Sequence, residues 1–149
     1  MKWVTWENVG VDRMACAWLI RRFIDENAQF LFVPAGSDQL PQDAERFDIP
    51  GTQYSHYRGH CSFHTMLHSF GLKDAVLHRL SRIIDEADTL QEIMLEPIAA
   101  GLDAICQGLR MTSDNDHEAL EKGYMIYEAL YVQLAVEDLP ANRSHRQNE

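Results

Sequence analysis

The first fifty residues alternate between short apolar segments typical of strands and one longer segment typical of a helix. Residues 2–6, 28–36 and 45–51 are rich in strand-forming side chains, and the second and third segments are ended by proline and glycine. Between the first two segments, residues 13–24 place apolar side chains on one helical face. A strand, a helix and a strand within about 30 residues predict a right-handed βαβ unit with parallel strands.

After Gly51 the apolar pattern is helical. Ser62 is the expected N-cap of a helix over residues 63–70, and Gly71 ends that helix. Asp74 is the expected cap of the next helix, which is strongly amphipathic. Its apolar positions recur at helical spacing: Val76, Leu77, Leu80, Ile83, Ile84 and Ala87.

Two longer helices complete the pattern. Thr89 or Pro97 begins the first of them, and proline suits a first helical turn because its missing N–H group is not needed there. Ser113 or Asp114 begins the second, which extends to about Val136.

The pattern as a whole predicts one domain over residues 1–136, because no repeat or linker interrupts it. Residues 137–149 are polar and predict a flexible tail. The expected fold class is α/β and predominantly helical, with a small N-terminal three-stranded sheet followed by four to five helices.

Composition and charge exclude several classes of protein. The chain has 149 residues, of which 46% are hydrophobic, as expected for one domain with a real core. It has no apolar run near the ~18 residues of a membrane span and no apolar signal segment at its start, so we expect a cytoplasmic protein without a membrane partner. The net charge of −10 disfavours direct nucleic-acid binding, which normally requires a basic face.

The candidate chemistry centres on residues 54–71, which hold four histidines and one cysteine. Imidazole and thiolate groups are preferred ligands of zinc and other first-row transition metals. His64 and His68 are four residues apart, so they project from the same helix face, and His60 joins them only if the helix begins before Ser62. The cluster matches no zinc-finger spacing.

These residues predict a divalent metal site with His56, Cys61 and His64 as ligands. Asp88 or His117 is expected to complete it, since both lie where helix ends meet loops. The expected metal is zinc or another first-row transition metal. The alternative is that the histidines are exposed and Cys61 fills the core, with Asp88 and His117 acting as helix caps or solvated groups.

A second constellation, formed by Asp12, Arg13 and Cys16, follows the first predicted strand. Open α/β sheets bind ligands beyond the carboxyl ends of their strands, and an arginine at a helix N-terminus can hold an oxyanion. Arg13 with Arg21 or Arg22 is therefore a candidate site for a small oxyanion. The alternative is that Asp12 caps its own helix and Cys16 is buried packing.

The three cysteines are too few for a disulfide framework, and we expect free thiols. Cys16 and Cys61 are predicted to start helices, where the thiolate is favoured, and to form a redox pair at one sheet edge. Cys106 lies within a helix and is expected to be buried and inert. The alternative is that all three are packing residues.

Taken in order, several segments resemble the chromate-resistance domain family, which occurs as the C-terminal part of ChrB-type regulators and as a stand-alone protein. The likeness runs from about Trp3 to Tyr131. It is carried by VDRMACAWLIRRFIDENAQFLFVP, FDIPG, HYRGHCSFHTML, IIDEADT, AAGLDAICQGL and DHEALEKGYMIYEALY. The resemblance implies a chromate-responsive role and no established reaction, so catalytic residues are unknown.

The family's pattern covers many of the candidate residues of this chain. At position 64 we expect an acidic residue in many relatives, and His64 keeps a metal-ligating group there. His60 and His68 lie outside the family's pattern. The residues covered are Asp12, Arg13, Cys16, Trp18, Arg21, Arg22, Asp25, His56, Cys61, Ser62, Phe63 and Asp88.

Three functions are compatible with these observations. The leading hypothesis is a metal-binding domain of the chromate or heavy-metal stress response, acting as a sensor or as an unassigned metalloenzyme. The second is a module that binds chromate or sulfate without a metal. The third is a structural protein that forms homodimers and whose histidines are incidental.

Overall fold

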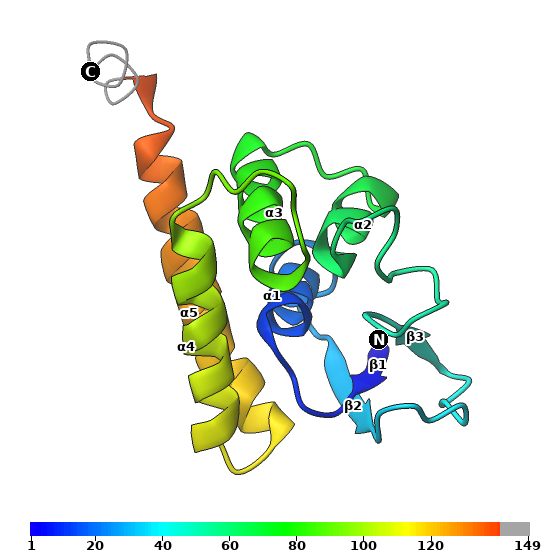
Figure 1. Ribbon diagram of the computed structural model, residues 1–149. Coiled ribbons are helices and arrows are strands. Elements are labelled where there is room, and N and C mark those ends of the chain that lie inside the picture. Colours follow the sequence, from blue (N-terminus) through cyan, green and yellow to red (C-terminus); the bar gives the residue numbers. More distant parts are fainter. Residues whose placement is uncertain (141–149) are drawn as a thin grey trace.

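The computed structural model describes residues 1–140 and confirms the expected α/β, predominantly helical fold (Figure 1). The predicted tail lies outside the described residues from 141 onward. Within residues 1–140, none of the helices combines the length and apolar character of a membrane span. The elements are β1 (Lys2–Trp6), α1 (Val11–Leu19), its π-helical continuation η1 (Ile20–Ile24), β2 (Gln29–Val33), β3 (Ala44–Arg46), α2 (Ser62–Ser69), α3 (Ala75–Asp88), α4 (Ile98–Thr112) and α5 (Asp116–Glu137).

The three strands form a parallel sheet in the order β2-β1-β3, which confirms the predicted βαβ unit. In the central strand, Lys2 pairs with Gln29 of β2 on one side and with Ala44 of β3 on the other. Because the strands are parallel, the chain leaves β1 and β3 at the same edge of the sheet. The segments that follow these two strands therefore begin close together.

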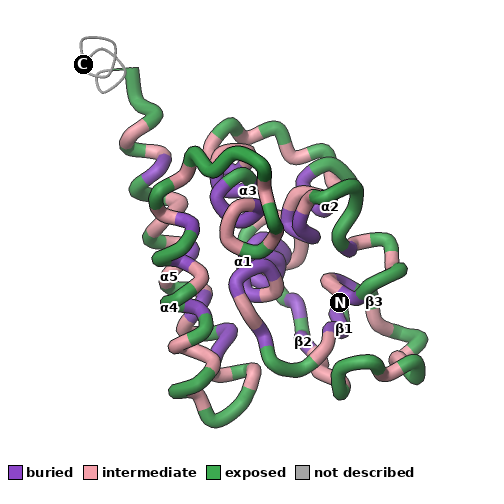
Figure 2. The backbone as a smooth tube through the Cα atoms, viewed as in Figure 1, coloured by how far each residue is buried: buried purple, intermediate pink, exposed green. Residues whose placement is uncertain are grey.

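Helix α1 lies at the centre of the molecule, with α2 and α3 on one side and α4 and α5 on the other (Figure 1). The sequence predicts an apolar stripe on one face, but every residue of α1 except Arg13 is buried (Figure 2). Trp18 packs against Phe23, Tyr127 and Tyr131, which ties α1 to η1 and α5. A helix buried on all sides needs an internal partner for any charge that it carries.

Three predicted helix caps have different outcomes. Asp74 caps α3 as expected, since its carboxylate accepts hydrogen bonds from the first N–H groups of that helix. Helix α4 begins after Pro97 and not at Thr89. Helix α5 begins after Asn115, whose side chain accepts a hydrogen bond from the backbone of the third residue beyond it, so the predicted cap at 113–114 is wrong by one or two residues.

Candidate metal centre

Asp12 lies in the first turn of α1 and is only 2% exposed. Its carboxylate accepts hydrogen bonds from the backbone N–H groups of Ser62 at 2.8 Å and Phe63 at 3.0 Å, at the start of α2. The first N–H groups of a helix have no partner within the helix and attract a carboxylate. The prediction that Asp12 caps its own helix is therefore wrong. It caps α2, because the fold brings the start of α2 beside the buried first turn of α1.

A second buried carboxylate holds the same helix end. Asp85, on α3, accepts a hydrogen bond from the Cys61 backbone at 2.8 Å, and its other oxygen lies 2.7 Å from Nδ1 of His60. Ser62, the predicted cap, instead donates its hydroxyl proton to Asp48 at 2.6 Å. The N-terminus of α2 is thus fixed by aspartates from two other helices.

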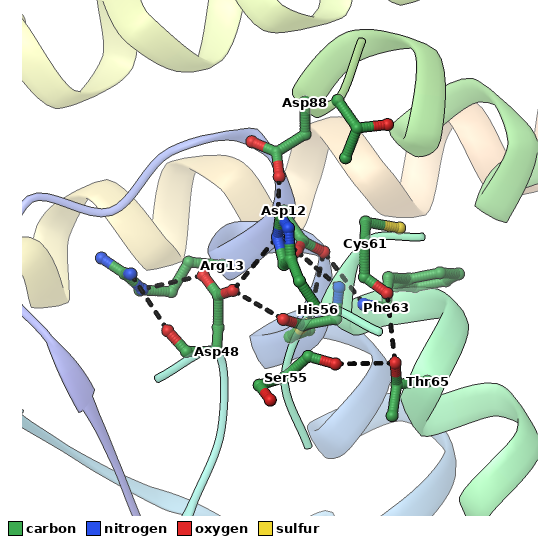
Figure 3. A network of polar contacts seen from close by, with 12 residues as sticks. Asp12, Arg13, Asp48, Ser55, His56, Cys61, Phe63, Thr65 and Asp88 are labelled. Atoms are coloured by element: carbon green, nitrogen blue, oxygen red, sulfur yellow. Dashed lines mark hydrogen bonds and ion pairs between the residues drawn. The ribbon is translucent and has the colours of Figure 1, made fainter. Parts of the chain in front are cut away.

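His56 collects three carboxylates around one imidazole nitrogen (Figure 3). Its Nε2 lies 3.0 Å from an oxygen of Asp12, 3.0 Å from Asp88 and 3.7 Å from Asp48. One ligating atom each from Asp12, Asp48 and His56 lie within 4.8 Å of one another. The four residues come from α1, the segment after β3, the loop before α2 and the end of α3, so only the folded chain assembles them.

Arg13 connects the segments that follow β1 and β3 around this group. Its Nε lies 3.1 Å from the Asp48 carboxylate, and its terminal nitrogens donate to the backbone carbonyls of Trp6, Glu7 and Asp48 at 3.1, 3.1 and 3.2 Å. Asp48 has a φ of 51°, a left-handed conformation that non-glycine residues adopt only when their surroundings hold them there. Arg13 and Ser62 supply that restraint.

A cavity of about 450 Å³ adjoins the group. Its walls include His56, Asp48, Asp88 and Arg13, together with Trp6 from the end of β1. The buried indole N–H of Trp6 has no hydrogen-bond partner within residues 1–140. The cavity therefore offers room for a small solute beside the histidine and the carboxylates.

The charges of the group perturb its ionisation. Burial and the neighbouring Asp12 raise the pKa of Asp48 to about 7, against the lowering effect of Arg13 and Ser62. Hydrogen bonds with Asp12 and Asp88 raise the pKa of His56 to about 10. At neutral pH a protonated His56 therefore balances part of the carboxylate charge. A divalent cation supplies the same balance and binds the neutral imidazole, so it would displace that proton.

The structure brings together two of the predicted metal ligands, His56 and Asp88. Within the described chain, the group does not include the other three. Cys61 is buried, and its backbone is bound to Asp85. The His64 ring stacks on the His60 ring, with centroids 3.9 Å apart, and His117 packs edge-on against Phe32.

Sequence reasoning missed Asp12 and Asp48 as members of this group. Both follow strands that lie next to each other in the sheet, Asp12 after β1 and Asp48 after β3. The rule that parallel sheets bind ligands beyond the carboxyl ends of their strands was the available signal. When this rule is applied to β1 and β3 together, it predicts that Asp12 and Asp48 lie at the same edge of the sheet.

The predicted oxyanion-binding arginines are not gathered in the described contacts. Arg21 pairs with Glu121 at 2.6 Å and Arg22 with Glu128 at 3.4 Å, both on α5. Arg13 is bound to Asp48 and to backbone carbonyls instead. Each of the three guanidinium groups therefore serves a separate structural contact.

All three cysteines are free and buried, which confirms that Cys106 is buried as predicted. Burial, followed by the charge of Asp12, raises the pKa of Cys16 and Cys61 well above the usual value. The expectation that both cysteines start helices is wrong for Cys16, which lies within α1. Cys61 directly precedes α2 as expected, but burial raises its pKa in spite of that position. Burial also raises the pKa of Cys106, to about 11.

Comparison with known proteins supports the resemblance found in the sequence. The family model described as "ChrB, C-terminal domain" matches residues 3–134, a range that contains all four residues of the group. Protein ChrB of Cupriavidus metallidurans is 39% identical over 131 residues, which cover 87% of this chain and 40% of that protein. The chain thus spans about two fifths of the length of this curated relative. No solved structure matches the chain.

Proposed function

The chain belongs to the family of the ChrB C-terminal domain, and from this premise we propose that it is a divalent-metal-binding domain of the chromate response. The proposed ligands are Asp12, Asp48, His56 and Asp88. The role in chromate response rests on the family, and the metal rests on the geometry of these side chains. Whether the bound metal serves sensing or catalysis depends on what occupies the adjoining cavity.

The observation that carries the proposal is the spacing of donor atoms around His56. Two donors that each lie about 2.1 Å from one ion are about 3.0 Å apart at a right angle and about 3.4 Å apart at a tetrahedral angle. The distances from His56 Nε2 to the three carboxylates are 3.0, 3.0 and 3.7 Å. Asp12, Asp48 and His56 offer donor atoms within 4.8 Å of one another, and Asp88 adjoins this set through its contact with His56.

The donor set determines which metals suit the site. Three carboxylates and one imidazole, without a thiolate, form a harder set than the sequence predicted. Such a set suits Mn²⁺, Fe²⁺ or Zn²⁺ and disfavours ions that require sulfur. The His56 side chain is 47% exposed and that of Asp88 28%, whereas that of Asp12 is 2% exposed, so an ion would enter past His56 and Asp88.

A metal-free oxyanion site is the second candidate. Its support is the cavity wall, where Arg13 and a His56 that is protonated at neutral pH lie with the indole N–H of Trp6, which has no hydrogen-bond partner within residues 1–140. Two carboxylates, Asp48 and Asp88, line the same cavity, and a third lies behind His56. Because these groups repel an anion and Arg13 is already paired, we prefer the metal.

Elemental analysis and metal titration of the untagged protein test the proposal. Asp88→Asn is the most informative variant, since within residues 1–140 the Asp88 side chain is paired only with His56. Asp103→Asn, in an exposed hydrogen bond on α4, is the matched control. We expect one Mn²⁺, Fe²⁺ or Zn²⁺ per chain in the wild type and control, and an affinity at least about tenfold lower in Asp88→Asn.

Absence of binding by the wild type at neutral pH, or equal affinity in Asp88→Asn, would overturn the metal assignment. Replacement of the gene by its Asp88→Asn form in the native host tests the biological role. The proposal requires lower tolerance of chromate in that strain than in the Asp103→Asn strain.

A further inference from the structure

A row of imidazoles lies along the side of α2, apart from the group around His56. Nε2 of His64 and Nε2 of His68 are 3.2 Å apart, one helical turn from each other. The ring of His60 lies nearly parallel to that of His64, with an angle of 11° between their planes. The ring centroid of His78, on α3, lies 5.8 Å from that of His68. We infer that His64 and His68 form a second metal site, which binds a borderline ion such as Cu²⁺, Ni²⁺ or Zn²⁺.

The spacing of the two ring nitrogens supports this assignment. Donor atoms of a four-coordinate ion with bonds of about 2.0 to 2.1 Å are about 2.8 to 3.4 Å apart. The separation of 3.2 Å lies within that interval. Without a metal, one of the two imidazoles can donate its Nε2–H to the lone pair of the other, whereas a bound cation would use the lone pairs of both.

The state of the rings also favours a metal. Burial, followed by the charge of His60, lowers the pKa of His64. His68 is exposed, which leaves one side of the pair open to solvent. The net charge of −10 attracts cations to the whole molecule.

His60 gives the row a further feature of metal sites. Its Nδ1 lies 2.7 Å from the carboxylate of the buried Asp85. This contact fixes the ring and leaves Nε2 as the nitrogen that could bind a metal. Carboxylates commonly orient metal-binding histidines in this way. The row therefore presents one chelating pair and a third imidazole stacked beside it, and donors of this kind select borderline transition metals.

This site is independent of the one proposed around His56. Its donors are all nitrogens, and it lies on the side of α2, whereas the carboxylate group caps the start of that helix.

Titration of untagged Asp88→Asn protein with Cu²⁺ tests the inference, because this background weakens the first site. We expect electron paramagnetic resonance to show hyperfine coupling to imidazole nitrogens. We also expect His68→Gln to lower the Cu²⁺ affinity at least about tenfold. His117→Gln, which removes an imidazole that packs against Phe32, is the matched control and should leave the affinity unchanged.

A thermal measurement provides a second readout. Excess Zn²⁺ should raise the melting temperature of Asp88→Asn protein more than that of the Asp88→Asn/His68→Gln double variant, because a ligand stabilises only the state that binds it. Equal Cu²⁺ affinity with and without His68, or a Cu²⁺ spectrum without nitrogen coupling, would overturn the second site. Neither result affects the assignment of the first site, which is tested by comparing the metal affinity of the wild type with that of Asp88→Asn.

Discussion

The carboxylate of Asp12 accepts a hydrogen bond from the backbone N–H of Ser62 at 2.8 Å, across 50 positions of sequence. The oxygen involved also lies 3.0 Å from Nε2 of His56. One buried atom therefore holds the start of α2 and forms part of the proposed metal centre.

The first prediction concerns the folding role of Asp12. Replacement by alanine leaves the N–H groups of Ser62 and Phe63 without their acceptor in a buried place, at a cost of about 1–3 kcal/mol for each such group. Relief of the repulsion from Asp48 offsets part of this cost. We expect Asp12→Ala to lower the free energy of unfolding by about 3 kcal/mol in urea with a chelator present. Asp103→Ala, which removes only an exposed hydrogen bond with Gln107 on α4, should change it by less than about 0.5 kcal/mol.

The second prediction is a pH dependence of the metal-free protein. Hydrogen bonds with Asp12 and Asp88 raise the pKa of His56 to about 10, above its ordinary value near 6.5. Below about pH 6.5 the imidazole is protonated in the folded and unfolded chains alike, and its contribution to stability is fully present. That contribution falls as the pH rises and is lost once the pH passes about 10.

Unfolding of wild type and His56→Gln in a chelator, at pH 6 and at pH 10, tests this dependence. The difference in free energy of unfolding between the two proteins should be largest at pH 6 and should shrink towards pH 10. His117→Gln measures the effect of a histidine outside the group. A difference that grows with pH would contradict the protonated state assigned to His56.

The third prediction concerns the contact between α1 and α5. A Cβ atom at Gly123 would lie 3.0 Å from Sδ and 3.3 Å from Cβ of Met14, which is closer than such atoms normally approach. Alanine is favoured over glycine within a helix by about 1 kcal/mol, but overpacking of a core costs about 1–3 kcal/mol. We expect Gly123→Ala to be destabilising by about 1 kcal/mol.

Gly108 provides the control within the same protein. A Cβ atom there meets no heavy atom within 4 Å in the described part of the chain, so Gly108→Ala should be stabilising by about 0.5–1 kcal/mol. Thermal or urea unfolding of the two variants measures the contrast. A stabilised Gly123→Ala would show that α1 and α5 are farther apart than the structure has them.

The sequence predicted the elements well because their signals are local. The apolar spacing of α3 and its cap at Asp74 depend only on neighbours along the chain, and both are present in the structure. The partner of Asp12 is 50 positions away, so its sequence neighbours indicated a cap for α1 where the fold provides one for α2. The predicted start of α5 differs from the observed one by only one or two residues, because several residues near Asn115 are capable of capping the helix.

The candidate site was predicted only in part for the same reason. His56 and Asp88 were named because of their chemistry, without knowledge of what lies between them. Asp48 follows a strand of three residues and has no motif, so only the parallel pairing of β1 and β3 identifies it. His64 was predicted to lie beside His56 but stacks on His60 instead. The spacing of residues along a helix does not indicate which side of the helix faces the core.

The fourth prediction is that none of the three thiols reacts in the native protein. Cys16, Cys61 and Cys106 each have a relative exposure of 0%, so a reagent reaches them only after local or global unfolding. Burial and nearby carboxylates raise the pKa of Cys16 and Cys61, which suppresses the thiolate that alkylating agents and oxidants attack. Mass spectrometry of protein treated with iodoacetamide should therefore find no labelled cysteine under native conditions and three in denaturant. Rapid native labelling of Cys16 or Cys61, ahead of Cys106, would restore the redox pair that the sequence suggested and would require a conformation in which the start of α2 leaves Asp12.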